Sequence, residues 1–194
     1  MNVAQPLVMG TKRDIGPSLG LYCFTPQTRD NARRLTPQTL IGAGSMKIAI
    51  ACDHGGYPLK APLIELMQSL GHEVLDLGAH ELDAQDDYPD FARYVGQAIQ
   101  HGQAERGVLL CGSGVGASIA ASKQDGVRAA VCHDTYSAGQ GVEHDDMNVL
   151  CLGARIVGEA VATELVRAFV NATFTAEQRH ARRLEKVNAI EASR

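Results

Sequence analysis

A cysteine followed by alternating glycines, in the segment from Cys111 to Ala117, has the clearest chemistry in this sequence. The apolar run 107–110 before it predicts a buried strand, and a helical pattern extends from Ala117 to Lys123. A turn from strand to helix presents backbone N–H groups and partial positive charge, where an anion can bind. We expect the same field to favour a thiolate, so that the Cys111 thiol ionises more easily than a free cysteine with its pKa of about 8.5. The segment combines a candidate base with a candidate anion site.

Polar residues also follow the other predicted strands. They are Asp53 and His54 after the first strand, His133 and Asp134 after the fourth, and Arg155 after the fifth. Ligands of parallel sheets bind beyond the carboxyl ends of the strands, near a switch in strand order. We therefore expect these side chains to gather with Cys111 at one edge of the sheet.

Two polar segments have alternative interpretations, the one that follows the first strand and one that precedes the fifth. Asp53 either caps the following helix by accepting its free N–H groups, or forms with His54 a pair that binds substrate hydroxyls. The segment 144–146, which begins with His144, is predicted to be a polar loop before the fifth strand. It is either a solvated acidic loop or the place of a histidine with a pKa near 6.5, able to move protons at neutral pH.

Two arginines, Arg179 and Arg183, are four residues apart in a predicted basic helix and share one face of it. Such a face is either solvated or forms a clamp for a phosphate group.

The glycine loop also fits a nucleotide site. Gly112, Gly114 and Ala117 satisfy the pattern G-x-G-x-x-A, and Asp134 lies at the end of a predicted strand, as a dinucleotide fold requires. However, the loop follows the third strand rather than the first, and a polar segment with glycines follows Asp134. A nucleotide-binding module is therefore the weaker alternative.

The composition indicates a soluble globular protein. The chain has 194 residues, 45% hydrophobic and 21% charged, with a formal net charge of −4. This charge gives no general attraction to nucleic acid or to anionic membranes. We find neither an apolar run of about 18 residues nor the pattern of a secretory signal. Five widely spaced cysteines favour a reducing cytoplasm over a disulfide framework, without a zinc-binding pair.

Strand and helix patterns alternate from Met46 onward. Strands are predicted at 47–52, 73–77, 107–110, 127–132 and 148–152, and helices at 59–70, 88–100, 117–123, 158–170 and 175–192. This alternation predicts an α/β fold: a five-stranded parallel sheet with helices on both faces, a Rossmann-like three-layer sandwich, plus a C-terminal helix. Residues 1–45 lack periodicity and are predicted to be a poorly ordered N-terminal extension, so the domain spans 46–194.

Residues 46–192 resemble the ribose-5-phosphate isomerase B family, which belongs to the wider sugar-phosphate isomerases that include galactose-6-phosphate isomerase subunits. The matching segments stand in the family's order and spacing. They are 51–56 (ACDHGG), 87–89 (DYP), 111–116 (CGSGVG), 119–123 (IAASK), 136–138 (YSA), 144–150 (HDDMNVL), 153–155 (GAR) and 179–180 (RH).

The resemblance implies aldose–ketose isomerisation without a metal or organic cofactor. In the branch of the family with cysteine in the glycine loop, this cysteine is the base that removes the C2 proton, and Cys111 occupies its position. The other branch uses a glutamate six residues later, where this chain has Ala117. His144 matches the histidine that opens the furanose ring. The residue after it is commonly Asn, whereas this chain has Asp145, which we place among the substrate-binding residues.

The resemblance also implies the remaining substrate contacts. Ser113 and the loop amides of Gly112, Gly114, Val115 and Gly116 bind the enediolate oxygens; Asp53, His54 and Tyr88 contact the sugar; Arg155, Arg179 and Arg183 bind the phosphate. Family members are homodimers or tetramers with a site partly shared between protomers. The implied substrates are ribose 5-phosphate and ribulose 5-phosphate, with allose 6-phosphate or a tetrose phosphate as alternatives. A non-catalytic subunit is a further alternative, disfavoured because Cys111, His144 and the arginines occur together.

Overall fold

The computed structural model describes residues 44–193, so nearly all of the predicted extension lies outside the described residues. The strands β1 to β5 are Lys47–Cys52, Glu73–Asp76, Arg106–Cys111, Ala129–Val131 and Val149–Gly153. The helices α1 to α6 are Tyr57–Ser69, Tyr88–Gln100, Val115–Ala121, Thr135–Asp145, Glu159–Asn171 and Gln178–Glu191. All strand pairs are parallel, in the order β2-β1-β3-β5-β4. The predicted α/β class and the five-stranded parallel sheet are confirmed.

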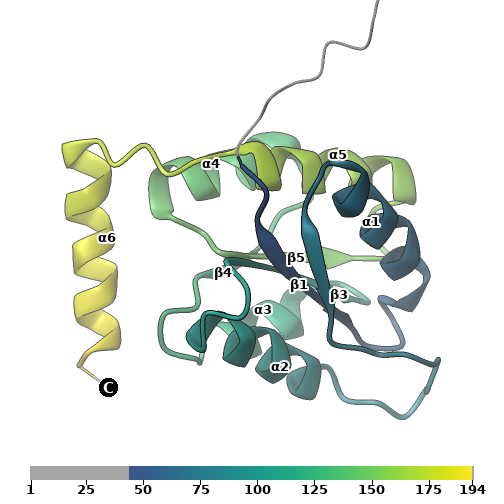
Figure 1. The fold of residues 1–194 in the computed structure, drawn as a ribbon. Helices are drawn as coiled ribbons and strands as arrows, with labels where there is room; N and C mark the ends of the chain where they lie inside the picture. Colours follow the sequence, from purple (N-terminus) through teal and green to yellow (C-terminus); the bar gives the residue numbers. More distant parts are fainter. Residues whose placement is uncertain (1–43, 194) are drawn as a thin grey trace, which may run out of the picture. The chain divides into compact units, whose positions relative to one another are not determined.

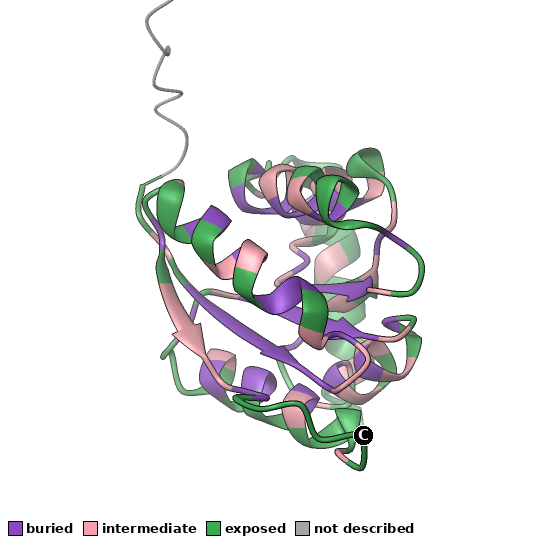
Figure 2. Cartoon of the chain, turned by 90° about the vertical axis from the view of Figure 1, so that its right-hand side faces the viewer, coloured by how far each residue is buried: buried purple, intermediate pink, exposed green. Residues whose placement is uncertain are grey.

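Helices cover both faces of the sheet (Figure 1). Because neighbouring residues of a strand point to opposite faces, β1 contributes to two separate hydrophobic clusters. Ile48 and Ile50 pack with α1, α4 and α5, whereas Ala49 and Ala51 pack with α2 and α3. The central strands are almost completely buried between these layers (Figure 2). They therefore form a rigid base for the loops at their ends.

The strand order changes direction between β1 and β3, which are neighbours in the sheet. The helix after β1 packs on one face, and the helix after β3 packs on the other. The two loops consequently diverge and leave a crevice at the carboxyl ends of these strands. The chain just before α1 nevertheless packs closely against the end of β3: a Cβ on Gly56 would lie 2.2 Å from the carbonyl carbon of Leu110. Only glycine fits at this crossing.

One helix was not predicted. Residues Thr135–Asp145, interpreted from the sequence as a polar segment ending in a loop, form the helix α4. Its two glycines and many polar residues obscure the helical pattern, because only Ala138 and Val142 are buried along it. The prediction that His144 lies in a loop is therefore wrong: it lies in the last turn of α4. The fourth strand is also shorter than predicted, at three residues.

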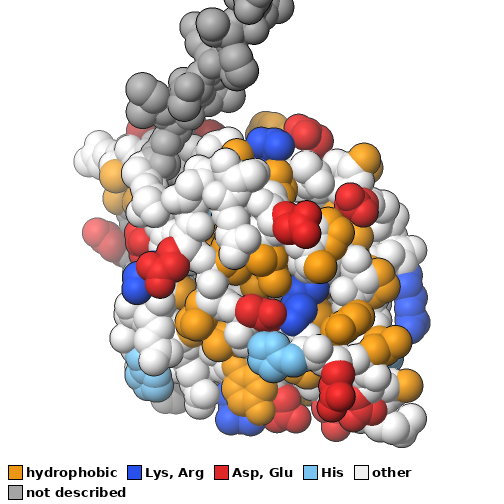
Figure 3. All heavy atoms as spheres, turned by 45° about the vertical axis from the view of Figure 1, so that its right-hand side comes forward, with side chains coloured by type: hydrophobic (Ala, Val, Ile, Leu, Met, Phe, Trp, Pro, Cys, Tyr) orange, Lys and Arg blue, Asp and Glu red, His pale blue; other side chains and the backbone are white. Residues whose placement is uncertain are grey.

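The last helix, α6, projects from the side of the layers next to α4 (Figure 1). Its buried residue is His180, while Val187 and Ile190 are exposed. On the face drawn in Figure 3, acidic and basic side chains are interspersed rather than separated into patches. Within residues 44–193, no helix combines the length and apolar character needed to cross a membrane.

Candidate active site

A cavity of about 360 Å³ lies in the crevice between β1 and β3. The residues that line it lie at the ends of three strands and in the loops after them. They are Asp53, His54 and Gly55 after β1; Cys111, the last residue of β3, with Gly112 and Ser113 after it; and Arg155 and Ile156 after β5. These residues are far apart in the sequence, but the carboxyl ends of parallel strands lie at the same edge of the sheet, which brings the residues together. The structure thus brings together four of the polar residues expected there: Asp53, His54, Cys111 and Arg155.

Cys111 and Asp53, which both line the cavity, contact each other directly. The Cys111 thiol donates a hydrogen bond to Asp53 Oδ2 over 2.9 Å, and both residues are buried. The other carboxylate oxygen, Oδ1, accepts from the backbone N–H of Gly56 at 2.9 Å. Asp53 therefore stabilises the turn before α1 rather than capping the helix itself, and it also lines the cavity. Its role in binding substrate hydroxyls stays a prediction.

The pKa of the Cys111 thiol is raised, contrary to the expectation that it ionises easily. Burial is the main cause, followed by the hydrogen bond to Asp53 and the negative charge of that carboxylate. Backbone N–H groups of Gly112 and Gly114 act in the expected direction and lower the pKa. They are outweighed, so in the free protein the thiol is the favoured form. The sequence could not show this, because the opposing carboxylate is 58 residues away.

His54 is oriented by a residue that sequence reasoning missed. Asp86 Oδ1 lies 2.6 Å from His54 Nδ1 and accepts the backbone N–H of the same histidine at 2.9 Å. The pKa of His54 is raised, chiefly by this hydrogen bond. Asp86 belongs to the acidic segment before α2, whose composition predicts only a solvated loop. No sequence signal separates it from the exposed aspartates around it.

The glycine loop is bordered by two further predicted site residues. The Tyr88 ring packs against the start of α3, where a Cβ on Gly116 would lie 2.8 Å from the ring. Ser113 is exposed, and its hydroxyl accepts a long 3.4 Å hydrogen bond from the N–H of Val115. Gly114 has φ +79°, which permits the sharp turn into the helix. Ser113 of this loop lines the same cavity as Cys111.

The polar residues after β4 have structural roles. Asp134 caps α4, accepting the N–H of Ser137 at 2.7 Å, and its pKa is lowered mainly by this backbone hydrogen bond. His133 Nε2 accepts the N–H of Gly153 at 3.1 Å. Neither residue lines the cavity. The dinucleotide interpretation requires Asp134 as a ligand-binding acidic residue, but its carboxylate instead accepts a hydrogen bond from the first turn of α4.

His144 lies at the opposite edge of the sheet from Cys111. The helix α4 starts beyond the carboxyl end of β4 and runs back to the amino end of β5, so its last turn lies near the amino ends of the strands. There His144 stacks against His180, with ring centroids 4.0 Å apart, and its Nδ1 lies 2.7 Å from Gln140 Nε2. His144 and Cys111 of one protomer are thus on different edges.

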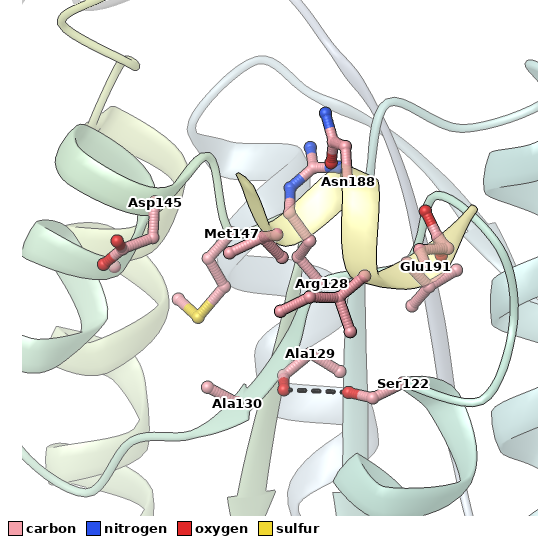
Figure 4. A pocket seen from close by; sticks show the side chains of 12 residues that line it. Ser122, Arg128, Ala129, Ala130, Asp145, Met147, Asn188 and Glu191 are labelled. Atoms are coloured by element: carbon pink, nitrogen blue, oxygen red, sulfur yellow. Dashed lines mark hydrogen bonds between the residues drawn. The ribbon is translucent and has the colours of Figure 1, made fainter. Parts of the chain in front are cut away.

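The remaining predicted residues lie near His144 rather than near Cys111. Arg179 and Arg183 are exposed in the first turns of α6, and Arg179 Nε lies 2.9 Å from Glu177. Asp145 is exposed on α4, beside a groove between α4, β4 and α6 (Figure 4). Across this groove, Arg128 extends toward Asn188 (Figure 4). His144, Arg179 and Arg183 therefore form a second group, whereas Arg155, the third predicted phosphate-binding residue, lies in the cavity with Cys111.

Among residues 44–193, no three or more His, Cys, Asp or Glu side chains are grouped so as to bind a metal ion. The four cysteines in this range are buried and unbridged; Cys23 lies outside it.

The known family described as ribose/galactose isomerase matches residues 48–187. This chain belongs to the ribose/galactose isomerase family. Ribose-5-phosphate isomerase B of Escherichia coli is 42% identical over 76% of this chain and 98% of its own length. D-erythrulose-4-phosphate isomerase of Pectobacterium atrosepticum is 39% identical over 66% of this chain and 85% of its own.

Solved structures of the family have the same fold. The crystal structure of ribose-5-phosphate isomerase B from Mycoplasma genitalium with bound ribulose-5-phosphate is 38% identical. It covers 76% of this chain and 97% of that chain, with a TM-score of 0.72. The resemblance inferred from the sequence motifs is confirmed. As a member of the ribose/galactose isomerase family, this chain is an isomerase.

Proposed function

We propose that this protein interconverts ribose 5-phosphate and ribulose 5-phosphate, with Cys111 as the base at C2. The observation that carries the proposal is the buried Cys111–Asp53 contact in a cavity that Arg155 and His54 also line. The choice of substrate is supported by the similarity to ribose-5-phosphate isomerase B enzymes, one of which was crystallised with ribulose-5-phosphate. A carbon acid beside a carbonyl needs a base on one side and stabilisation of the developing oxyanion on the other. The cavity supplies both.

The reaction requires only proton transfers. The Cys111 thiolate removes the proton from C2 of the open-chain aldose, and the electron pair forms the C1–C2 double bond of an enediolate. The amides of the glycine loop and the Ser113 hydroxyl stabilise the negative oxygen while a proton moves between O1 and O2. Returning the proton to C1 gives the ketose. No oxidant or reductant is consumed.

Asp53 holds the sulfur in place, because its Oδ2 accepts the thiol hydrogen bond. Among the groups that act on the Cys111 thiol, the N–H groups of Gly112 and Gly114 favour its ionised form. A thiolate with a raised pKa is also a stronger base toward a carbon-bound proton. The raised pKa of Cys111 is therefore compatible with its role as a base.

The complete site needs a second protomer. His144, Arg179 and Arg183 lie at the amino edge of the sheet, whereas Cys111 and Asp53 lie at the carboxyl edge. A homodimer in which one protomer's α4–α6 region covers its partner's crevice would unite the two groups, and pairs of dimers would form tetramers.

The expectation of a cytoplasmic protein is part of this proposal and is supported by the unbridged thiols.

An isomerase assay on a panel of aldose phosphates tests the proposal. We expect the highest kcat/KM for ribose 5-phosphate, with allose 6-phosphate and erythrose 4-phosphate lower. The similarity to D-erythrulose-4-phosphate isomerase makes a tetrose phosphate the second candidate substrate. Higher kcat/KM for the tetrose would replace the proposed substrate and leave the mechanism intact.

Ligand-induced stabilisation separates the isomerase from the nucleotide-binding alternative. We expect ribose 5-phosphate to raise Tm, and NAD or ATP to leave it unchanged, since only a true ligand stabilises the folded state. A Tm increase with a nucleotide and none with any sugar phosphate would refute the isomerase proposal.

A further inference from the structure

One residue from a distant segment contacts both the main chain and the ring of His54. Asp86 precedes α2, 32 residues further along the chain, and its Oδ1 accepts the His54 N–H and lies 2.6 Å from Nδ1. An ionised carboxylate can only accept hydrogen bonds, so Nδ1 carries a proton. Nε2, which has no hydrogen-bond partner in the described part of the chain, is the ring nitrogen left for a ligand in the cavity.

The burial of Asp86 favours a charged partner. Its side chain is 10% exposed, and within the described residues its Oδ2 is buried without any hydrogen-bond partner. A buried carboxylate with an unpaired oxygen is costly unless an opposite charge is close. The imidazole of His54 is the cationic group in contact with it. The geometry therefore favours the imidazolium form of His54.

The other groups around His54 do not reverse this preference. The hydrogen bond from Asp86 is the largest influence and raises the pKa of His54, whereas partial burial lowers it. The negative charges of Asp53 and Asp86 raise the pKa further, and the positive charge of Arg155 lowers it. Together they leave the His54 pKa above its ordinary value of 6.5.

We propose that Asp86 is a positioning residue, which holds His54 in one ring orientation as an imidazolium whose Nε2–H donates to an oxygen of the phosphorylated substrate. Asp86 does not line the cavity and acts through His54 alone. The part of this inference that concerns the substrate rests on the proposed isomerase function. The part that concerns the charge and tautomer of His54 does not.

The first experiment needs no substrate. The His54 ring protons and nitrogens are followed by NMR against pH in the free protein, and are assigned by their absence in His54→Gln. We expect the Nδ1–H tautomer and a pKa above 6.5 in the wild type. An ordinary or lowered pKa, or the Nε2–H tautomer, would overturn the inference even if the protein is a ribose-5-phosphate isomerase.

Asp86→Asn tests the charge with little change in shape. Asparagine retains an oxygen that can accept from the His54 N–H, so the turn keeps this hydrogen bond while the negative charge is lost. We expect the His54 pKa to fall by about one unit. Glu81→Gln removes the same charge from an exposed position of the same loop and should leave the His54 pKa unchanged. Equal shifts in both variants would show a general charge effect and refute the specific role of Asp86.

The pH dependence of KM then connects His54 to the substrate. Below both pKa values His54 is charged in the wild type and in Asp86→Asn, so the two KM values should agree. Above both, the charged fraction in the variant is about tenfold smaller, so its KM should be up to about tenfold higher. A KM ratio that does not change with pH, or the same ratio in a His54→Gln background, would show that Asp86 only packs the loop.

Discussion

The two edges of the sheet differ in how their polar residues are satisfied. At the carboxyl edge, Cys111 donates to Asp53, and His54 is held by Asp86, all within one protomer. At the amino edge, His144 stacks on another histidine, and Arg183 projects from an exposed helix. The first edge holds its polar groups through contacts within one protomer, as the proposed reaction site requires, whereas the second presents cationic and imidazole groups outward. This difference fits the proposed dimer, in which the second edge contributes to a site on another protomer.

The largest expected effect concerns the carboxyl edge. Cys111→Ala removes the base, and we expect kcat to fall by about a thousandfold or more while sugar-phosphate binding is nearly unchanged. Steady-state kinetics together with calorimetric binding measure both quantities. Cys132→Ala, which removes another buried thiol outside the cavity, is the matched control and should retain turnover. Near-normal turnover in Cys111→Ala would exclude this residue as the base.

Subunit complementation tests whether the two edges of different protomers form one site. Cys111→Ala and His144→Ala should each be nearly inactive on ribose 5-phosphate. When the two chains are refolded together in equal amounts, half of the dimers are mixed, and one of their two sites contains both intact residues. We expect about a quarter of wild-type activity.

Activity that stays at the level of the separate variants would mean that Cys111 and His144 do not meet across an interface. Sedimentation of the mixture, with one chain carrying a tag, checks that mixed dimers form.

The exposed arginines should affect binding more than turnover. Arg179→Ala removes a cation from the start of α6, and we expect KM for ribose 5-phosphate to rise by about tenfold at unchanged kcat, because phosphate binding is remote from the reacting carbons. Arg182→Ala, on the same helix, is the control for charge alone. A lower kcat with unchanged KM would place Arg179 at the reacting end instead.

The sequence predicted much of the carboxyl edge but not its electrostatics, and it wrongly placed His133 and Asp134 beside Cys111. Short apolar strands alternating with helices predict the parallel sheet, and this topology brings Asp53, Cys111 and Arg155 together without further information. The thiol pKa was predicted in the wrong direction, because it depends on burial and on a carboxylate from another strand. Asp86 was missed for the same reason: a long-range contact distinguishes it from its acidic neighbours.

The amino edge was less predictable. The helix α4 carries only a narrow apolar face and two glycines, so its periodicity is weak and His144 was assigned to a loop. The error matters, since a helix of this length carries the chain from the carboxyl edge to the opposite one. The family motifs singled out His144, Arg179 and Arg183 as candidate site residues but gave no information on which edge they occupy.

The smallest effect concerns the stability of the amino edge. His180 is buried, and its pKa is lowered by this burial and by the neighbouring His144. The unfolded chain therefore binds a proton more readily than the folded protein, and His180 makes stability fall as the pH drops from about 6.5 toward the lower folded pKa. Between pH 7.5 and pH 5, we expect the Tm of His180→Gln to fall by about 2–4 °C less than the Tm of the wild type. His101→Gln, at an exposed position after α2, should retain the wild-type loss. Identical acid sensitivity in all three proteins would mean that protonation of His180 does not destabilise the α4–α6 contact, and that this edge is held by other contacts.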